Sequence, residues 1–197
     1  WLGHCPFFLF ILAHSMGGLV ARSAFYYGEK AEHTWLAQVN KMVFLGTPHH
    51  GAALEKGGNL IDVLLGSNPY SKPFAKLGQI RSAGITDLRY GSIIDEDWQG
   101  KDRFSYAMDN RGTLALPNGV HCYTLAAVKS KESTVVGDGL IGDGLVNVDS
   151  ALGRHNDDLL HLTFPEHHQW IGRDMNHMDL LYHPDVYRKI RQWLLDP

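Results

Sequence analysis

A single serine separates an apolar run from a helical segment that begins with small residues. The run Phe-Phe-Leu-Phe-Ile-Leu-Ala covers residues 7–13, and Ser15 follows two positions after Ala13. A serine hydroxyl is a weak nucleophile until a neighbouring base takes its proton. One way to expose such a hydroxyl is a sharp strand-to-helix turn of the pattern G-x-S-x-G, the nucleophile elbow. With Ala13 and Gly17 at the flanking positions, the chain has A-x-S-x-G. The pattern predicts Ser15 as a catalytic nucleophile.

The elbow makes two further demands on its neighbours. The turn is strained, so we expect the residues two before and two after the serine, Ala13 and Gly17, to be small for steric reasons. A helix that begins behind the serine points its free N–H groups and positive dipole end at the site. The N–H of Met16 is therefore predicted to donate to an oxyanion. The alternative is a glycine-rich turn with an incidental serine.

Three aspartates compete for the role of the acid. A triad on this kind of elbow runs in the order Ser, acid, His, and Gly-Asp-Gly occurs at 137–139 and again at 142–144. Asp143 is the first choice because it follows a predicted strand. Asp138 is its rival, and Asp149 is a weaker third candidate.

The best candidate for the base is His177, which follows the last predicted strand and precedes the last helix. His183 stands directly before a proline and is predicted to start that helix. His14, His49 and His50 are close to the serine in sequence or at a neighbouring strand end, where they could line a pocket. They precede the acid, which is the wrong order for the base.

These three groups predict acyl transfer to water. Ser15 would attack an acyl carbonyl, and His177 would take its proton and return it to the leaving alcohol. Asp143 would hold the imidazole tautomer and stabilise the imidazolium.

The elements that position these residues alternate between strands and helices, which predicts an α/β fold with a mostly parallel sheet. Short apolar runs predict buried strands at 7–13, 41–45, 121–128 and 159–164. One helix is predicted over 18–27 with Gly28 as its C-cap, and another starts at Pro184 and carries an apolar stripe to Leu194. Residues 52–118 are predicted as an insertion that forms a cap. Six of its apolar residues could make a lid helix or simply pack on the core, namely Leu54, Leu60, Ile61, Val63, Leu64 and Leu65.

Composition and charge limit the partners and cofactors that the chain is expected to have. The 197 residues suffice for one domain, and the net charge of -3 gives no reason to expect nucleic acid as a partner. No apolar run approaches the roughly 18 residues of a membrane span. The 12 histidines lack cysteine partners at metal spacing, so neither a metal nor a cofactor is expected. Cys5 and Cys122 are expected as buried thiols, although one bridge between them is an alternative.

Four sequence blocks together resemble one family. Ala-His-Ser-Met-Gly-Gly-Leu-Val-Ala-Arg (13–22) resembles the elbow of α/β-hydrolase lipases and esterases. Val-Phe-Leu-Gly-Thr-Pro-His-His-Gly-Ala (43–52) is similar to the following strand and loop in bacterial lipases and the PGAP1-like (GPI inositol-deacylase-like) group. The segments 142–153 and 176–181 resemble that group's acid loop and histidine segment.

The resemblance implies an α/β-hydrolase fold and carboxylic-ester hydrolysis by Ser15, Asp143 and His177, with Met16 as an oxyanion donor. It also implies that the turn from Thr47 to Gly51, which contains His49, flanks the acyl pocket. The group name does not by itself imply a GPI substrate.

The chain departs from that family at its start, because members carry several strands before the elbow, and a loop among them supplies the second oxyanion N–H. We therefore expect the 197 residues to hold the C-terminal part of one α/β-hydrolase domain. The elbow strand is expected to show an unpaired apolar edge, and the chain expressed alone is expected to be poorly soluble and weakly active.

The leading functional hypothesis is a serine esterase or lipase that acts on small-molecule or lipid esters, with transient contact between its cap and a lipid interface. The first alternative is an acyltransferase with the same triad, which product partition with an added alcohol would reveal. The second is a non-catalytic hydrolase-like binding module, which loss of a triad residue would indicate.

Overall fold

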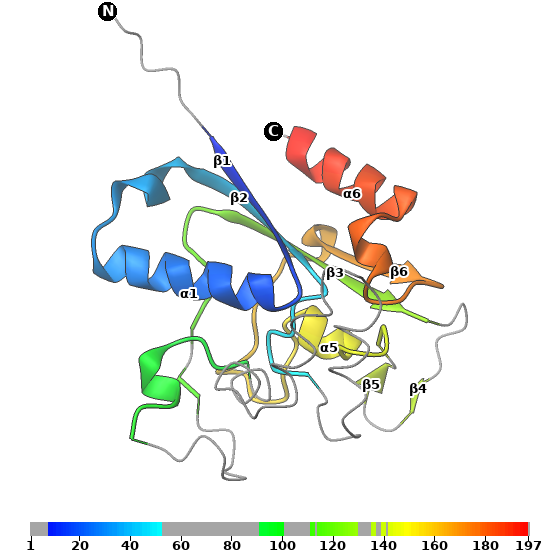
Figure 1. The fold of residues 1–197 in the computed structure, drawn as a ribbon, viewed down its shortest axis with the longest axis horizontal. Coiled ribbons are helices and arrows are strands. Elements are labelled where there is room, and N and C mark those ends of the chain that lie inside the picture. The colour runs from blue at the N-terminus through cyan, green and yellow to red at the C-terminus, as the bar shows by residue number, and fades with distance from the viewer. Residues whose placement is uncertain are drawn as a thin grey trace, which may run out of the picture.

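The computed structural model describes residues 8–52, 91–100, 111–112, 114–129, 135–136, 139–140 and 142–196. Their centre is a four-stranded sheet in the order β1-β2-β3-β6 (Figure 1). Every neighbouring pair in it is parallel. The strands are β1 (Leu9–His14), β2 (Val39–Leu45), β3 (His121–Val128) and β6 (Gln169–Arg173). The α/β class with a parallel sheet is thus confirmed.

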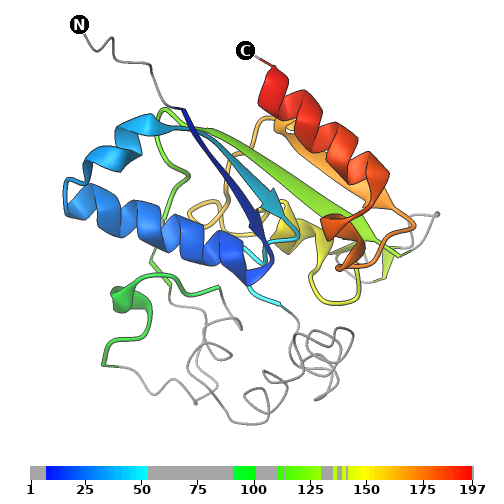
Figure 2. The same cartoon turned by 45° about the horizontal axis from the view of Figure 1, so that its top comes forward.

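Two long helices cover opposite faces of this sheet (Figure 2). Helix α1 (Met16–Lys30) packs Phe25 with Met42 and Phe44 of β2. Helix α6 (Pro184–Leu195) packs Val186 and Trp193 on the other face, in one cluster with alternate residues of β2 and β3. Successive side chains of a strand point to opposite faces, so a strand covered on both sides is apolar throughout.

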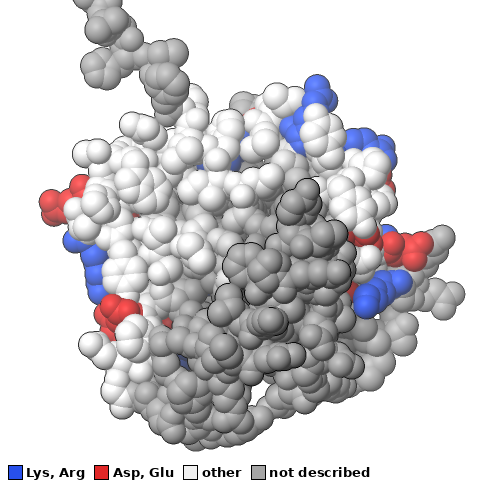
Figure 3. All heavy atoms as spheres, viewed as in Figure 1, with Lys and Arg blue, Asp and Glu red and all other residues white. Residues whose placement is uncertain are grey.

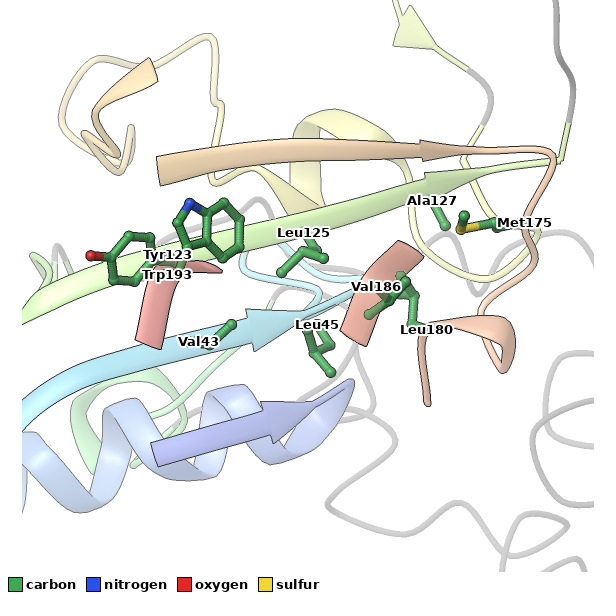
Figure 4. Close-up of a cluster of buried hydrophobic side chains, with 9 residues drawn as sticks. All are labelled: Val43, Leu45, Tyr123, Leu125, Ala127, Met175, Leu180, Val186 and Trp193. Carbon is green, nitrogen blue, oxygen red and sulfur yellow. The ribbon is translucent and has the colours of Figure 1, made fainter. Parts of the chain in front are cut away.

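The cluster under α6 reaches from the middle of the sheet to the loop after β6. Figure 4 shows Leu180 and Val186 beside Leu45, and Trp193 beside Tyr123. The Tyr123 and Trp193 rings lie 4.9 Å apart. Leu180 is wholly buried and belongs to the short helix η5 (Asp179–Leu181). This anchor fixes the chain near the predicted base.

The capping residues predicted for α1 and α6 can be compared with the observed helix ends. His183 is the N-cap of α6 and accepts a hydrogen bond from the Asp185 N–H, and Pro184 is the first helical residue, as predicted. Gly28 is not the C-cap of α1, because the helix continues to Lys30 and Ala31 is its C-cap. The structure gives a different reason for a glycine at position 28, which is close packing. A Cβ there would lie 3.2 Å from the Trp35 ring.

The prediction of a strand at 159–164 is wrong. These residues form turns and irregular backbone, and the fourth strand of the sheet is β6, where Thr124 of β3 pairs with Gln169. Leu162 and Phe164 are buried against the α1 side of the core. The Leu162 N–H, however, donates to Gly153 and the Phe164 N–H to Leu162, so their burial does not come from a strand ladder.

Strand β1 is an edge of the sheet, and three of its apolar side chains are exposed. Leu9, Phe10 and Leu12 are 40%, 44% and 56% exposed. Within the described part of the chain no strand pairs with the outer side of β1. This is the unpaired apolar edge that the sequence predicts.

Shorter elements connect these parts. They are η1 (Thr34–Gln38), η3 (Asp95–Asp97), β4 (Val135–Val136), β5 (Gly139–Leu140), α5 (Val148–Ala151) and η4 (Glu166–His168). Strands β4 and β5 form an antiparallel pair. Of the predicted cap over 52–118, residues 53–90, 101–110 and 113 lie outside the described residues, and so does the predicted lid helix over 54–65.

Cys122 is a free thiol, and burial raises its pKa to about 12. Cys5 lies outside the described residues. Over the described ranges, no helix is both long enough and apolar enough to cross a membrane.

Candidate active site

Ser15 occupies the turn between β1 and α1 with a backbone conformation that side-chain-bearing residues rarely adopt. Its φ is 54° and its ψ is -131°. The Ser15 N–H donates to the Leu45 carbonyl of β2 at 2.8 Å, and the Ser15 carbonyl accepts from the Gly18 N–H at 3.0 Å. These bonds hold the strained turn against the end of the neighbouring strand. Met16 is the first residue of α1, so its N–H has no intrahelical acceptor.

Contacts with other described parts of the chain do not crowd Gly17, and the position that they crowd is the next one, Gly18. Among the described atoms, nothing lies within 4 Å of a Cβ built at Gly17. A Cβ at Gly18 would instead lie 2.0 Å from Oγ1 of Thr47, which is wholly buried. The elbow helix thus approaches the turn after β2 most closely at Gly18.

His177 and Asp143 form a buried pair. The Nδ1 atom of His177 lies 2.6 Å from Oδ2 of Asp143, and their side chains are only 2% and 1% exposed. The other carboxylate oxygen, Oδ1, accepts from the N–H groups of Leu145 and Val146, both at 2.9 Å. All of the carboxylate's oxygens are therefore used, which fixes its orientation toward the imidazole.

The rival acids have other positions. Asp149 lies in the first turn of α5, half-exposed, with its carboxylate 3.6 Å from Arg154. Asp138 lies outside the described residues.

A tight turn after β6 carries His177. The Asn176 side chain accepts from the Met178 N–H at 2.8 Å, and the Asp179 carboxylate accepts from the Asn176 N–H at 2.7 Å. Such side-chain bonds to nearby backbone set a turn locally. With Leu180 buried below it, the turn has little freedom to move His177.

The His177 ring lies against the end of β2, beside the elbow. A Cβ at Gly46, which has a φ of 56°, would be 3.0 Å from Cε1 of His177. The Gly46 N–H continues the ladder to the Leu125 carbonyl. Nε2 of His177 is buried and has no hydrogen-bond partner among the described residues, Ser15 included. In structures without substrate, catalytic hydrogen bonds are often long or unformed.

His14 is the nearest aromatic neighbour of His177. The two ring centroids are 4.6 Å apart, and Nε2 of His14 lies 3.2 Å from the His177 carbonyl oxygen. Burial lowers the pKa of His14, and the nearby His177 lowers it further. His14 is thus held neutral and donates to the backbone of the turn that carries His177.

Thr47 and His49 occupy packing positions in the turn after β2. Both are essentially buried, and the His49 ring packs 5.0 Å from Phe44 and 5.5 Å from Phe164. Neither side chain is open to a substrate in this structure. Burial lowers the pKa of His49 well below its usual value, and Arg22 lowers it further. Burial also lowers the pKa of His50 to about 4.

Arg22 of α1 is a buried residue that sequence reasoning missed. Its Nη1 atom lies 3.4 Å from Nδ1 of His49, and it donates to the Leu114 carbonyl. Burial lowers the pKa of Arg22 to about 10, and Arg111 adds to the effect. In the sequence, Arg22 could have been noticed because it is a single cation in a stretch of mostly small and apolar residues (Gly-Gly-Leu-Val-Ala-Arg-Ser-Ala-Phe).

In the described ranges, no group of three or more His, Cys, Asp or Glu side chains is arranged to hold a metal ion. The arrangement contains instead a serine on a strained turn, a buried imidazole with one ring nitrogen available, and a carboxylate that orients the other. Such a set can exchange a proton with a bound nucleophile or leaving group.

The chain matches the model of a protein family. Residues 5–128 match the family described as the PGAP1-like alpha/beta domain. The matched segment contains the elbow, β1, α1, β2 and β3, and it ends before Asp143 and His177. A search of curated proteins finds no match to the chain.

Proposed function

Because the chain belongs to the PGAP1-like α/β domain family, we propose that it is a serine carboxylic-ester hydrolase that works through an acyl-enzyme. The observation that carries this proposal is the buried 2.6 Å contact between His177 and Asp143. It lies at the same end of the sheet as the strained Ser15 turn. The substrate is proposed to be a small-molecule or lipid ester.

In the first half of the proposed reaction, the Ser15 Oγ attacks the acyl carbonyl carbon while Nε2 of His177 takes its proton. The carbonyl oxygen becomes an oxyanion and accepts from the Met16 N–H. Nε2 then gives the proton to the leaving alcohol, and the acyl group stays on Ser15. Asp143 keeps the Nδ1–H tautomer and stabilises the imidazolium.

In the second half, water takes the place of the alcohol. His177 accepts a proton from the water, whose oxygen attacks the acyl carbon, and the proton then returns to the Ser15 oxygen as the acid leaves. The unpartnered Nε2 atom of His177 fits a base that must accept and release protons during each cycle.

The test is hydrolysis of p-nitrophenyl butyrate and p-nitrophenyl palmitate by wild type, Ser15→Ala and His177→Asn. We expect both variants to lose at least about 10³-fold in kcat. His183→Asn is the matched control, because His183 caps α6 and asparagine is also a good N-cap. It should keep wild-type rates. Folded wild type that is no faster than Ser15→Ala on either ester would overturn the proposal.

A further inference from the structure

An apolar groove lies along the side of α1 and begins next to the nucleophile. It has a volume of about 450 Å³ and is lined on the helix side by Met16, Val20, Ala24 and Tyr27. Across from them are Ile93 and Trp98, in the segment that carries η3. Figures 1 and 2 both show this segment, in green, beneath α1. The volume is in the range of small-molecule sites.

The segment that carries η3 forms the wall of the groove opposite α1, and two contacts attach this wall to the last turns of α1. The Tyr27 hydroxyl accepts from the Asp95 N–H at 2.8 Å, and Lys30 lies 3.0 Å from the Glu96 carboxylate. The Asp97 carboxylate accepts from the Ile93 N–H at 2.9 Å and from the Gly112 N–H at the same distance. The wall is therefore tied to the helix at the end remote from Ser15.

Most of the groove's lining is apolar, with Ser23, Ser92 and Asp95 as polar members, and the groove is open to solvent. Met16 is 48% exposed and Val20 is 60% exposed. In Figure 3 the described surface seen over the left part of α1 is mostly uncharged, with charged groups at its left margin. Exposed large apolar side chains that line a concave surface mark it as a binding site more strongly than scattered ones do.

The helix gives the groove a direction and a length. Residues 16, 20, 24 and 27 follow the i, i+4 and i+3 spacing of one helix face, so the groove extends away from Ser15. From Met16 to Tyr27 the helix rises about 16 Å, at about 1.5 Å per residue. An extended aliphatic chain advances about 1.25 Å per methylene, because its C–C bonds of about 1.5 Å zigzag. About twelve methylenes therefore match the groove.

We propose that this groove binds the acyl chain of the ester, in extended form and up to about twelve carbons long. The inference rests on the proposed ester hydrolysis. Met16 connects the two sites, because its N–H faces the carbonyl oxygen in the proposed mechanism while its side chain lines the groove. The acyl carbon bound to Ser15 thus has its chain at the end of the groove that Met16 lines.

The proposed position of the acyl chain can be tested by blocking the groove at two distances from Ser15. Val20 lies about 6 Å along the helix from Met16, and Ala24 about 12 Å. Val20→Trp should block the groove beyond about five methylenes, and Ala24→Trp beyond about ten. Val20 and Ala24 are both exposed, so the added rings can be accommodated by the fold. Tyr187→Trp, at a 66% exposed position on α6, is the control for added bulk.

The measurement is KM and kcat on p-nitrophenyl butyrate, octanoate and laurate, each below its micelle concentration. A fully buried methylene is worth about 3- to 4-fold in affinity. We expect Val20→Trp to raise KM at least about 10-fold for octanoate and laurate, and Ala24→Trp to do so for laurate alone. Butyrate should stay within about 2-fold for both, and Tyr187→Trp should match wild type on all three.

Binding of laurate to Ser15→Ala, followed by calorimetry, separates this inference from the proposed function. If no ester is turned over but laurate binds and Val20→Trp weakens its binding, the hydrolase proposal fails and the groove stands. Equal effects of both tryptophans on all three chain lengths would overturn the groove. A preference for dodecyl acetate over p-nitrophenyl laurate would also overturn it, because the chain would then belong to the alcohol.

Discussion

Two buried histidines at the carboxyl end of the sheet differ in the sign of the charge beside them. His177 and His49 are both about 2% exposed or less. Each has Nδ1 next to a charged side chain, and each has an Nε2 without a partner among the described residues. The neighbour of His177 is the Asp143 carboxylate, whereas the neighbour of His49 is the Arg22 guanidinium.

The two partners have opposite consequences for the imidazole. A carboxylate accepts the Nδ1 proton and stabilises the ring when Nε2 takes a second proton. A guanidinium can only donate, so Nδ1 of His49 is an acceptor and a second proton on the ring is opposed by the positive charge. Burial alone therefore does not distinguish a candidate base from a packing residue, and the charge beside Nδ1 does.

The largest expected effect comes from removing the favourable charge. Asp143→Asn should lower kcat about 10⁴-fold on p-nitrophenyl butyrate, because the amide no longer imposes the Nδ1–H tautomer. The unfolding midpoint in urea should shift much less than the activity. Asp149→Asn, half-exposed in α5, is the control and should stay within about 2-fold. Equal activity of the two variants would assign the acid to another residue.

The second prediction concerns stability and pH. Burial holds His49 and His50 neutral in the folded state, and the pKa of His50 falls to about 4. In the unfolded chain a histidine has a pKa near 6.5, so below this pH the unfolded state binds more protons. The free energy of unfolding should therefore fall as the pH drops from about 6.5 toward about 4, by up to about 1.4 kcal/mol per pH unit for each such histidine.

Urea unfolding at half-unit pH steps measures this slope. His49→Phe keeps an aromatic ring between Phe44 and Phe164 and should reduce the slope by about one proton. His183→Asn, at the half-buried N-cap of α6, should leave the slope unchanged. A slope that does not respond to His49→Phe would mean that His49 is protonated in the fold, contrary to its place beside Arg22.

The third prediction tests the contact between helix α1 and the turn that carries His49. Gly18→Ala should destabilise the protein by about 1–3 kcal/mol, because its Cβ would overlap Thr47 in the turn that carries His49. Gly17→Ala is the matched control, one residue away with open space around it. It should be neutral or stabilising by up to about 1 kcal/mol, because alanine favours the helix. Both are read from urea midpoints.

The sequence correctly predicted structural features that are set by residues close together in the chain. The strand before Ser15 and the helix start at Pro184 each depend on neighbouring residues. The sequence could not distinguish Gly17 from Gly18, because the crowding comes from Thr47, almost thirty residues later. It could not assign His49 a packing position for the same reason, since Arg22 reaches it across the fold.

The misplaced fourth strand has a related cause. Leu162 and Phe164 are buried as the apolar pattern suggests, but their N–H groups bond within nearby turns. Gln169–Arg173 pairs with β3 although it is short and only partly apolar. Apolar pattern reports burial, and strand pairing is a separate property that depends on which backbone lies alongside.

The smallest expected effect concerns His14, whose ring lies against His177 and whose neighbouring ionisable groups are His177 and Asp143. His14→Phe keeps the ring but loses the hydrogen bond to the His177 carbonyl. It should lower kcat by about 5-fold, the value of one hydrogen bond of about 1 kcal/mol. His14→Gln keeps a donor at a similar reach and should lose less.

The pH profile of kcat/KM decides whether His14 acts by position or by charge. Burial and His177 lower the pKa of His14, so protonation of its ring is disfavoured and its replacement should remove little positive charge. The acid limb should therefore stay within about half a pH unit of wild type in both variants. A larger shift would mean that His14 carries a proton while His177 acts. In that case His177 would act as a base beside a positively charged neighbour. The sign of the nearby charge would then no longer explain why His177, rather than His49, is the candidate base.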